Sequence, residues 1–363
     1  MHLFVDISGH GLGHLAITAP VLHALAESGP LHLTVRSGIP EAHLRERIRL
    51  PFHLIPAASD FGFVMVDALQ VDREASAAAY RAAHADWPAR VAAEADFLRR
   101  LAPDQVLSNV SYLPLAGAAQ AGLPAVALCS LNWADLFAHF FAHEDWAAPI
   151  HAQMLAAYRG ARTFVCTTPG MAMPALPHRV AVGPIARLGP ASSRHSARNL
   201  IPDDLNQAGR ATQTSRRVLL AMGGITHFLP VDRWPRVPGV RWLIPADWPL
   251  QHPDAEPFDR QGLDFTALLC SVDAVITKPG YGTFTEAACN SIPVLYQRRE
   301  DWPEQDCLIE WLQRYGMCQE ISGEALACGD VTSALESLWA LPRPVPPSPT
   351  GAQEAADFLR ALS

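Results

Sequence analysis

Residues 277–286 of this chain read TKPGYGTFTE and separate two segments of different character. The apolar run 274–276 before them is typical of a buried strand, and the run 286–289 after them is typical of a helix. A glycine-bearing turn between a strand and a helix lets the free N–H groups and the positive dipole end of the helix face a ligand. The stretch therefore predicts an α/β fold with a diphosphate site at this turn.

A second glycine-rich turn lies near the N-terminus, where residues 9–14 read GHGLGH. It follows a predicted strand at 3–7 and precedes a predicted helix at 16–27, which is the context that a ligand-facing loop needs. Two such turns, one in each half of the chain, predict a cleft between two domains.

Strand-like and helix-like runs alternate through both halves, which predicts a doubly wound parallel sheet in each. We expect one Rossmann-like domain over residues 1–191, a polar linker over 192–215 and a second Rossmann-like domain over 216–341. Residues 342–363 form a proline-rich connector and an amphipathic helix, which we expect to cross back onto the N-terminal domain. The long helical pattern at 76–100 should be kinked or divided by Pro88.

The composition is that of an ordinary globular protein, with 363 residues, 49% hydrophobic and 18% charged. A formal net charge of −8 argues against general nucleic-acid binding, which needs a basic surface. No uncharged apolar run approaches about 18 residues, so no transmembrane segment is expected. The chain opens directly into a strand without a signal peptide, and its seven cysteines show no pairing or metal-binding motif. These features predict a cytoplasmic protein with reduced thiols.

The C-terminal half resembles the nucleotide-sugar transferases of the GT-B glycosyltransferases. In that group a glutamate in the helix after the glycine turn binds the nucleotide ribose, and Glu286 matches it. An acid–Gln pair contacts the donor sugar, which Glu304 and Gln305 match with Glu in place of the commoner Asp. Gly223 and Gly224 match a second loop on the phosphate side.

A closer resemblance, over nearly the whole chain, is to the glycosyltransferase-like N-terminal region of plant L-arabinokinase and its bacterial relatives. The segments that carry it are 9–14, 67–73, 132–135, 169–174 and 278–286. The resemblance implies a GT-B fold, with an acceptor-side domain followed by a nucleotide-sugar-binding domain across a cleft. The kinase half of those proteins is absent from this sequence, so sugar phosphorylation is not implied.

The candidate catalytic residues are His14, His10 and Asp67. A histidine titrates near neutrality and can take a proton from an attacking hydroxyl or water. In some nucleotide-sugar hydrolases of this fold a Gly-x-Gly-His histidine activates water, and His14 matches that position. The competing interpretations are histidines that only pack against the turn and an Asp67 that only forms a salt bridge in a loop. No third ligand accompanies the two histidines, so no metal site is expected.

The candidate ligand-binding residues lie in the two glycine turns, in the loop after residue 222 and after the strand at 294–296. They are Gly11, Gly13, Gly223, Gly224, Thr226, Lys278, Gly280, Gly282, Thr283, Glu286, Arg298, Glu304 and Gln305. Lys278 can neutralise phosphate as a point cation, although a plain surface lysine is an equal alternative. Arg298 belongs to the charge cluster 298–301, whose alternative is solvated surface.

These residues predict a metal-independent glycosyltransferase that uses a nucleotide-diphosphate sugar, with UDP as the expected nucleotide, and an unknown acceptor. No separate cofactor is expected. A nucleotide-sugar hydrolase or epimerase of the same fold is the first alternative. A module that binds nucleotide sugars without turnover is the second.

Overall fold

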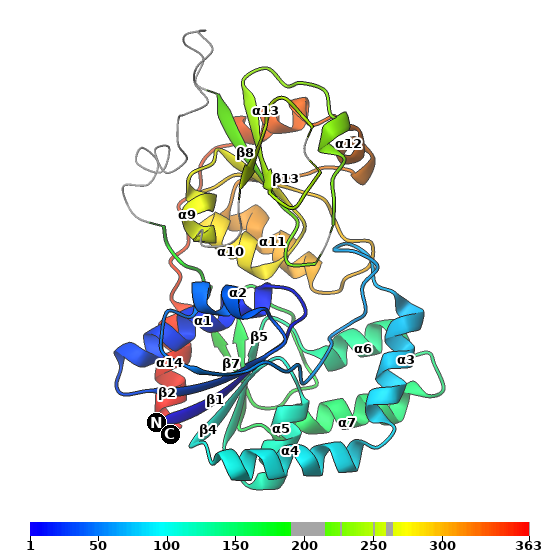
Figure 1. The fold of residues 1–363 in the computed structure, drawn as a ribbon, viewed down its shortest axis with the longest axis vertical. Coiled ribbons are helices and arrows are strands. Elements are labelled where there is room, and N and C mark those ends of the chain that lie inside the picture. The colour runs from blue at the N-terminus through cyan, green and yellow to red at the C-terminus, as the bar shows by residue number, and fades with distance from the viewer. Residues whose placement is uncertain (190–214, 226, 250, 259–263, 363) are drawn as a thin grey trace.

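The computed structural model describes residues 1–189, 215–225, 227–249, 251–258 and 264–362. The chain forms two lobes, one below the other in Figure 1, and each is built on its own parallel sheet. All but the last residue of the predicted linker 192–215 lies outside the described residues. The doubly wound α/β architecture expected from the alternating pattern is confirmed.

The sheet of the N-terminal lobe has, within the described residues, seven parallel strands in the order β3-β2-β1-β4-β5-β6-β7. Its order reverses between β1 and β4, and ligands of open α/β sheets bind outside the carboxyl ends of the strands at such a point. The strands are β1 (His2–Ile7), β2 (His32–Ser37), β3 (His53–Ile55), β4 (Gln105–Asn109), β5 (Ala125–Cys129), β6 (Thr163–Thr167) and β7 (Arg179–Val182).

The sheet of the C-terminal lobe repeats this plan with, in the described part of the chain, six parallel strands in the order β10-β9-β8-β11-β12-β13. Here the order reverses between β8 and β11, the strands that precede the Gly223 loop and the 277–286 turn. The strands are β8 (Arg216–Ala221), β9 (Val240–Pro245), β10 (Ala255–Phe258), β11 (Ala274–Thr277), β12 (Val294–Tyr296) and β13 (Cys318–Glu320).

The helices of the N-terminal lobe are α1 (Gly13–Glu27), α2 (Glu41–Arg47), α3 (Arg73–His84), α4 (Trp87–Leu101), α5 (Leu113–Ala121), α6 (Trp133–Phe141) and α7 (Ala147–Gly160). The predicted long helix divides between α3 and α4, where Asp86 caps α4 by accepting the N–H of Ala89 and Pro88 occupies the first turn.

The C-terminal half contributes α9 (Phe265–Cys270), α10 (Tyr281–Cys289), α11 (Gln305–Tyr315), α12 (Gly323–Cys328), α13 (Thr332–Ala340), α14 (Gly351–Ala361) and the short 3₁₀ helix η2 (Val231–Arg233). Helix α14 crosses back and packs on α1 and β7, as predicted, so the two chain ends lie close together in Figure 1. Arg360 fixes this crossing because it donates to the carbonyl oxygens of Leu25 and Gly29 at the end of α1.

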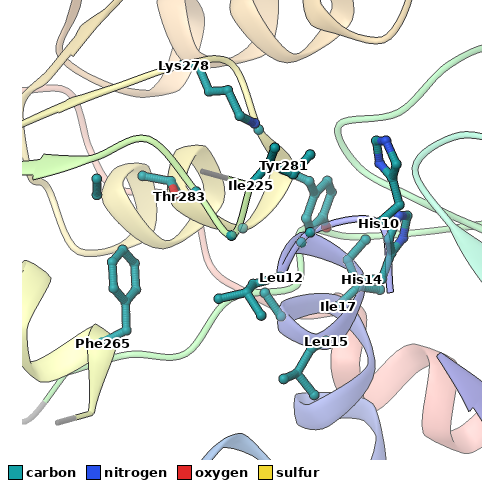
Figure 2. A pocket seen from close by; sticks show the side chains of 18 of the residues that line it. His10, Leu12, His14, Leu15, Ile17, Ile225, Phe265, Lys278, Tyr281 and Thr283 are labelled. Atoms are coloured by element: carbon teal, nitrogen blue, oxygen red, sulfur yellow. The ribbon is translucent and has the colours of Figure 1, made fainter. Parts of the chain in front are cut away.

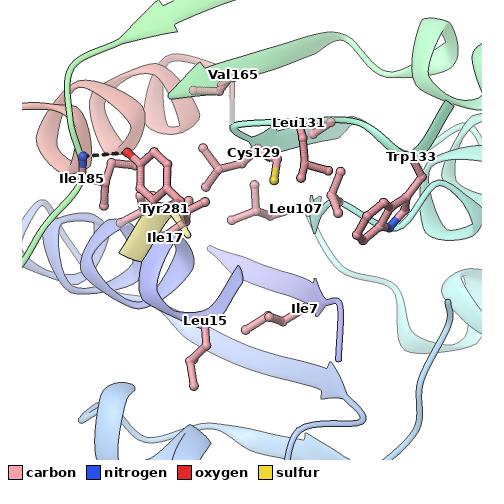
Figure 3. Packing of buried hydrophobic residues seen from close by; sticks show 14 of the residues in the cluster. Ile7, Leu15, Ile17, Leu107, Cys129, Leu131, Trp133, Val165, Ile185 and Tyr281 are labelled. Carbon is pink, nitrogen blue, oxygen red and sulfur yellow. Dashed lines mark hydrogen bonds between the residues drawn. The ribbon is translucent and has the colours of Figure 1, made fainter. Parts of the chain in front are cut away.

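The hydrophobic core is continuous across the two lobes. Tyr281, the first residue of α10, is buried among Ile17, Leu131 and other core residues of the N-terminal lobe (Figure 3). Its hydroxyl accepts the N–H of Ile185 at 2.9 Å. The lobes are therefore joined by an apolar contact that surrounds the start of α10.

The loop 59–73 makes a second junction, rising from the N-terminal lobe toward the other in Figure 1. Leu69 is buried in the core of the C-terminal lobe, and its carbonyl accepts the N–H of Glu300. Arg73 forms an ion pair with Asp301, which also accepts from His139. None of the helices in the described parts of the chain has the length and apolar character that a membrane crossing requires.

A buried ion cluster ties helix α4 to the sheet of the N-terminal lobe. Arg36 donates through Nε to Asp6 at 2.6 Å and through both terminal nitrogens to Glu94 at 2.9 and 2.6 Å. All three side chains are at least nine-tenths buried. Removing one partner of such a cluster leaves uncompensated buried charge.

We expect Arg36→Met to destabilise the N-terminal lobe by about 3–5 kcal/mol, because the buried carboxylates of Asp6 and Glu94 then lose the cation that pairs with both of them. Arg45→Met is the matched control, since Arg45 makes an exposed pair with Glu41 that should contribute about 0.5 kcal/mol. Urea unfolding followed by circular dichroism measures both. Equal losses in the two variants would contradict a structural role for the cluster.

Candidate functional site

A pocket lies between the lobes at the carboxyl ends of both sheets, where each strand order reverses. Figure 2 shows His10 and His14 entering it from the N-terminal lobe and Lys278 from the C-terminal lobe. Most of the predicted site residues line this pocket. They are His10, Gly11, Gly13, His14, Gly223, Gly224, Lys278, Gly280, Gly282, Thr283 and Glu304.

The N-termini of two helices open into this pocket, one from each lobe. The first intrahelical bonds run from Ala16 N–H to the carbonyl of Leu12 and from Phe284 N–H to that of Gly280. The N–H groups of residues 13–15 and 281–283 therefore have no acceptor within their own helix, and all six residues line the pocket. Two positive dipole ends at one cavity favour an anionic ligand.

Two of the predicted site glycines permit the lobes to approach each other. A Cβ atom on Gly282 would lie 2.7 Å from the Cβ of Ala16 in α1, and one on Gly224 would lie 2.8 Å from Leu12. Gly223 has a φ of +95°, so the turn before Gly224 needs a residue without a side chain. These glycines therefore fix the spacing between the lobes as well as lining the pocket.

We expect Gly282→Ala to push α10 away from α1 and to destabilise the closed arrangement by about 1–3 kcal/mol, because the new methyl group overlaps Ala16. Gly13→Ala is the control, since a Cβ on Gly13 meets nothing within 4 Å. Small-angle scattering and thermal unfolding measure the separation and the stability. An unchanged radius of gyration and melting temperature in Gly282→Ala would contradict the expected overlap.

The half-buried Lys278 and the buried Arg299 are cations that line the pocket. Burial, with the nearby charge of Arg299, lowers the pKa of Lys278 to about 7, and burial also lowers the pKa of Arg299 to about 10. An anion in the pocket would favour the charged form of Lys278. The alternative of a plain surface lysine does not fit this burial.

Glu304 is the pocket's buried acid, and both of its oxygens are engaged. Ser130 of the N-terminal lobe donates to Oε1 at 2.5 Å, and the indole N–H of Trp302 donates to Oε2 at 3.2 Å. Ser130 and Trp302 also line the pocket, so Glu304 links the lobes beside the ligand site.

Hydrogen bonds fix the tautomer of His14. The Asn109 side-chain N–H group donates to the His14 carbonyl at 3.1 Å and to the Thr18 hydroxyl at 2.8 Å. Its oxygen, 3.0 Å from His14 Nδ1, must therefore accept a proton from that nitrogen. Nε2 is left as the unprotonated nitrogen of a ring that lines the pocket, which is the state of a general base.

His10 is held between aromatic side chains of the two lobes. Its ring is parallel to Trp302 at 5.5 Å and edge-on to Trp133 at 5.2 Å. Burial and the charge of Arg299 keep the pKa of His10 well below its ordinary value. Its Nε2 is buried and has no hydrogen-bond partner in the described residues, and a catalytic role for His10 stays a prediction.

Burial lowers the pKa of His14 to about 4. The folded protein should therefore lose stability as the pH falls from about 6.5 toward 4, because the unfolded chain takes up this proton first. We expect Asn109→Asp to raise the pKa of His14 by about 1–3 units, since a carboxylate would face Nδ1. NMR of ¹³C-labelled histidine measures both titrations. A wild-type midpoint near 6.5, or no shift in Asn109→Asp, would contradict this account.

Three predicted residues are occupied in other contacts. Glu286 is fully buried, pairs with Arg47 of α2 at 2.7 Å and accepts from Thr266 at 3.2 Å, so it reaches a ribose only if the Arg47 pair breaks. Gln305 exchanges hydrogen bonds with the main chain of Arg299 and so holds that residue in place. Arg298 pairs with Asp306 and Glu320 outside the pocket. Their contacts with a ligand stay predictions.

Asp67 lies at the tip of the loop 59–73 and joins the lobes. It accepts the N–H groups of Leu69 and Gln70 and forms a 3.1 Å ion pair with His227. Burial alone would raise its pKa, but the Leu69 N–H and His227 outweigh burial and lower it. A carboxyl with a lowered pKa is a weak base, so the geometry favours the salt-bridge interpretation over catalysis. Thr226 lies outside the described residues.

Sequence reasoning did not single out Asn109, Ser130 or Trp302, and it chose Arg298 where Arg299 enters the pocket. Consecutive residues of an extended segment point in opposite directions, so only one arginine after β12 can face the cleft. Asn109 could have been found from its position at the end of β4. Strand β4 pairs with β1, so this end lies beside the glycine turn that follows β1.

No family model matches the chain. Solved structures similar to it include the glycotransferase of kitacinnamycin, with a TM-score of 0.60 and 14% identity over 99% of this chain and 94% of that one. The glycosyltransferase VinC in complex with dTDP has a TM-score of 0.54 and 18% identity over 100% of this chain and 95% of its own. The fold is of the GT-B type.

UDP-GlcNAc 2-epimerase from Neisseria meningitidis, bound to UDP-GlcNAc, shares this GT-B fold with a TM-score of 0.60 and 11% identity over 99% of both chains. Among curated proteins, L-arabinokinase from Arabidopsis thaliana is 25% identical over 338 residues, which is 91% of this chain. The chain spans 31% of that relative's length. The expected resemblances to GT-B proteins and to L-arabinokinase are thus confirmed.

Proposed function

We propose that this chain binds a nucleotide-diphosphate sugar in the pocket between the lobes and transfers the sugar to an acceptor hydroxyl, with UDP as the expected nucleotide. The observation that carries the proposal is the convergence of two helix N-termini with Lys278 on a single pocket. The GT-B neighbours bound to dTDP and to UDP-GlcNAc support it. The cytoplasm stays the expected location.

The leaving group in this reaction is the nucleoside diphosphate. As the bond between the anomeric carbon and the diphosphate oxygen breaks, negative charge grows on that oxygen. The N–H groups at the start of α10 and the ammonium of Lys278 stabilise this charge in a site of low dielectric. In the described residues no group of three His, Cys, Asp or Glu side chains is arranged for a metal ion, and the proposal uses none.

The proton acceptor in the proposal is Nε2 of His14. The acceptor oxygen bonds to the anomeric carbon, and its proton passes to this nitrogen while Asn109 holds the opposite edge of the ring. Asn109 is neutral, so it orients the ring without balancing the charge of the imidazolium. His14 therefore gains a proton as negative charge accumulates on the departing diphosphate.

A second candidate is hydrolysis or epimerisation of the nucleotide sugar. The epimerase neighbour matches the chain over its full length with the same TM-score as the kitacinnamycin glycotransferase. If water replaces the acceptor, the same base gives hydrolysis. If the nucleotide returns to the sugar, the result is an epimer.

We expect wild-type protein to bind UDP or dTDP sugars, as measured by calorimetry, and to convert one of them, as measured by mass spectrometry of the products. His14→Gln should keep the affinity within about threefold and lower turnover by about 10²–10⁴, because glutamine fills the site but cannot take the proton. His139→Gln, which alters an exposed histidine that pairs with Asp301 and does not line the pocket, is the control.

The products separate the candidates. A glycoside in the presence of a hydroxyl acceptor supports transfer, whereas free sugar or an epimer supports the second candidate. Binding without any product over hours would indicate a non-catalytic module and overturn the catalytic proposal. Absence of nucleotide binding would overturn the site itself.

A further inference from the structure

The side chain of Arg299 has buried hydrogen-bond donors that no described residue of the protein accepts. The residue is 6% exposed and lines the pocket. Its Nε and one terminal nitrogen, Nη2, are buried and have no hydrogen-bond partner among the described residues. Leaving a charged donor buried without a partner is costly, so such a group in a pocket indicates a missing ligand atom.

The surrounding residues position Arg299 without neutralising it. Gln305 accepts the Arg299 N–H at 3.0 Å and donates to its carbonyl at 3.2 Å, which fixes the main chain. The guanidinium lies 3.7 Å from the centre of the Trp302 ring, so its plane is supported by an aromatic face. Glu304 and Asp67 are the nearby acids. The oxygens of Glu304 are already bonded to Ser130 and Trp302, and those of Asp67 to the main chain and His227. Neither acid accepts a hydrogen bond from Nε or Nη2 of the guanidinium.

The diphosphate has a separate set of partners. Lys278 lies in the turn before α10. Its Nζ is close to two site glycines: it would lie 3.6 Å from a Cβ atom added to Gly223 and 3.7 Å from one added to Gly280. The N–H groups at the start of α10 face the same turn. Arg299 instead follows β12, one strand further along the sheet, beside Glu304 and Trp302. The phosphates can thus be bound without Arg299.

The two unpartnered nitrogens lie on the same edge of the guanidinium. An edge with two parallel N–H groups matches the two oxygens of a carboxylate, and such bidentate pairs are the strongest that arginine forms. A neutral sugar offers only single hydroxyls there and leaves the charge of Arg299 uncompensated. An acidic sugar would satisfy both donors and the charge together.

We propose that Arg299 binds a carboxylate on the sugar of the ligand, so that the substrates of this site are nucleotide-linked uronic acids. This inference rests on the proposed nucleotide-sugar site. It assigns the diphosphate to Lys278 and α10 and the sugar carboxylate to the Arg299 edge. The same edge could instead hold a phosphate oxygen, which the experiment below distinguishes.

Affinities for UDP, UDP-glucose and UDP-glucuronate, together with the dTDP and dTDP-glucose pair, are measured by calorimetry on the full chain. We expect wild type to bind the glucuronate at least about tenfold more tightly than the glucose form, because the carboxylate satisfies two buried charged donors that the neutral sugar leaves unmatched. Arg299→Gln should remove this preference and leave the affinity for UDP unchanged. Arg299→Lys keeps the positive charge but loses the two parallel N–H groups. It should therefore retain only part of the preference for the glucuronate.

Arg298→Gln is the matched control, because it makes the same change at a neighbouring arginine that pairs with Asp306 and Glu320 outside the pocket. Equal wild-type affinity for the two UDP sugars would overturn the inference while leaving the proposed function intact. Weaker binding of UDP itself by Arg299→Gln would place Arg299 on the diphosphate and also overturn it. If no nucleotide binds to the wild type, the proposed function fails as well.

Discussion

The contact between the first turn of α10 and helix α1 determines how the two lobes meet. Gly282 packs against Ala16 at a distance that admits no side chain, and Tyr281 is buried in the core of the other lobe. This contact directs two helix N-termini into one pocket. Packed interiors transmit small displacements. A change in the spacing between α10 and α1 at Gly282 would therefore displace the ligand-facing groups of the site.

Burial then sets the charge state of the groups that meet there. Removal from water keeps His14 and His10 neutral and lowers the pKa of Lys278 to about 7. Arg299 remains charged at neutral pH, although burial lowers its pKa to about 10. The pocket therefore combines neutral bases with cations that lack full compensation, and an anionic ligand is the natural complement of such a site.

Much of the fold could be predicted because its signals are local. The break between α3 and α4 follows from a helix breaker, Pro88. The crossing of α14 onto α1 follows from the single apolar face of that helix. The glycine turns were located because a strand, a glycine turn and a helix follow each other in the chain. The contacts of Asp67, Glu286 and Arg298 could not be predicted, because His227, Arg47 and Glu320 are distant in sequence or paired across an interface.

The sequence by itself determined the doubly wound α/β architecture and the positions of the two glycine turns, since periodicity and turn chemistry depend on neighbouring residues. Its resemblance to known families indicated the GT-B type. Only the tertiary structure decided which of two adjacent arginines faces the pocket, which nitrogen of His14 is left unprotonated, and that Asp67 pairs with His227 of the other lobe. These outcomes depend on strand order and on contacts between residues far apart in the chain, which local patterns do not encode.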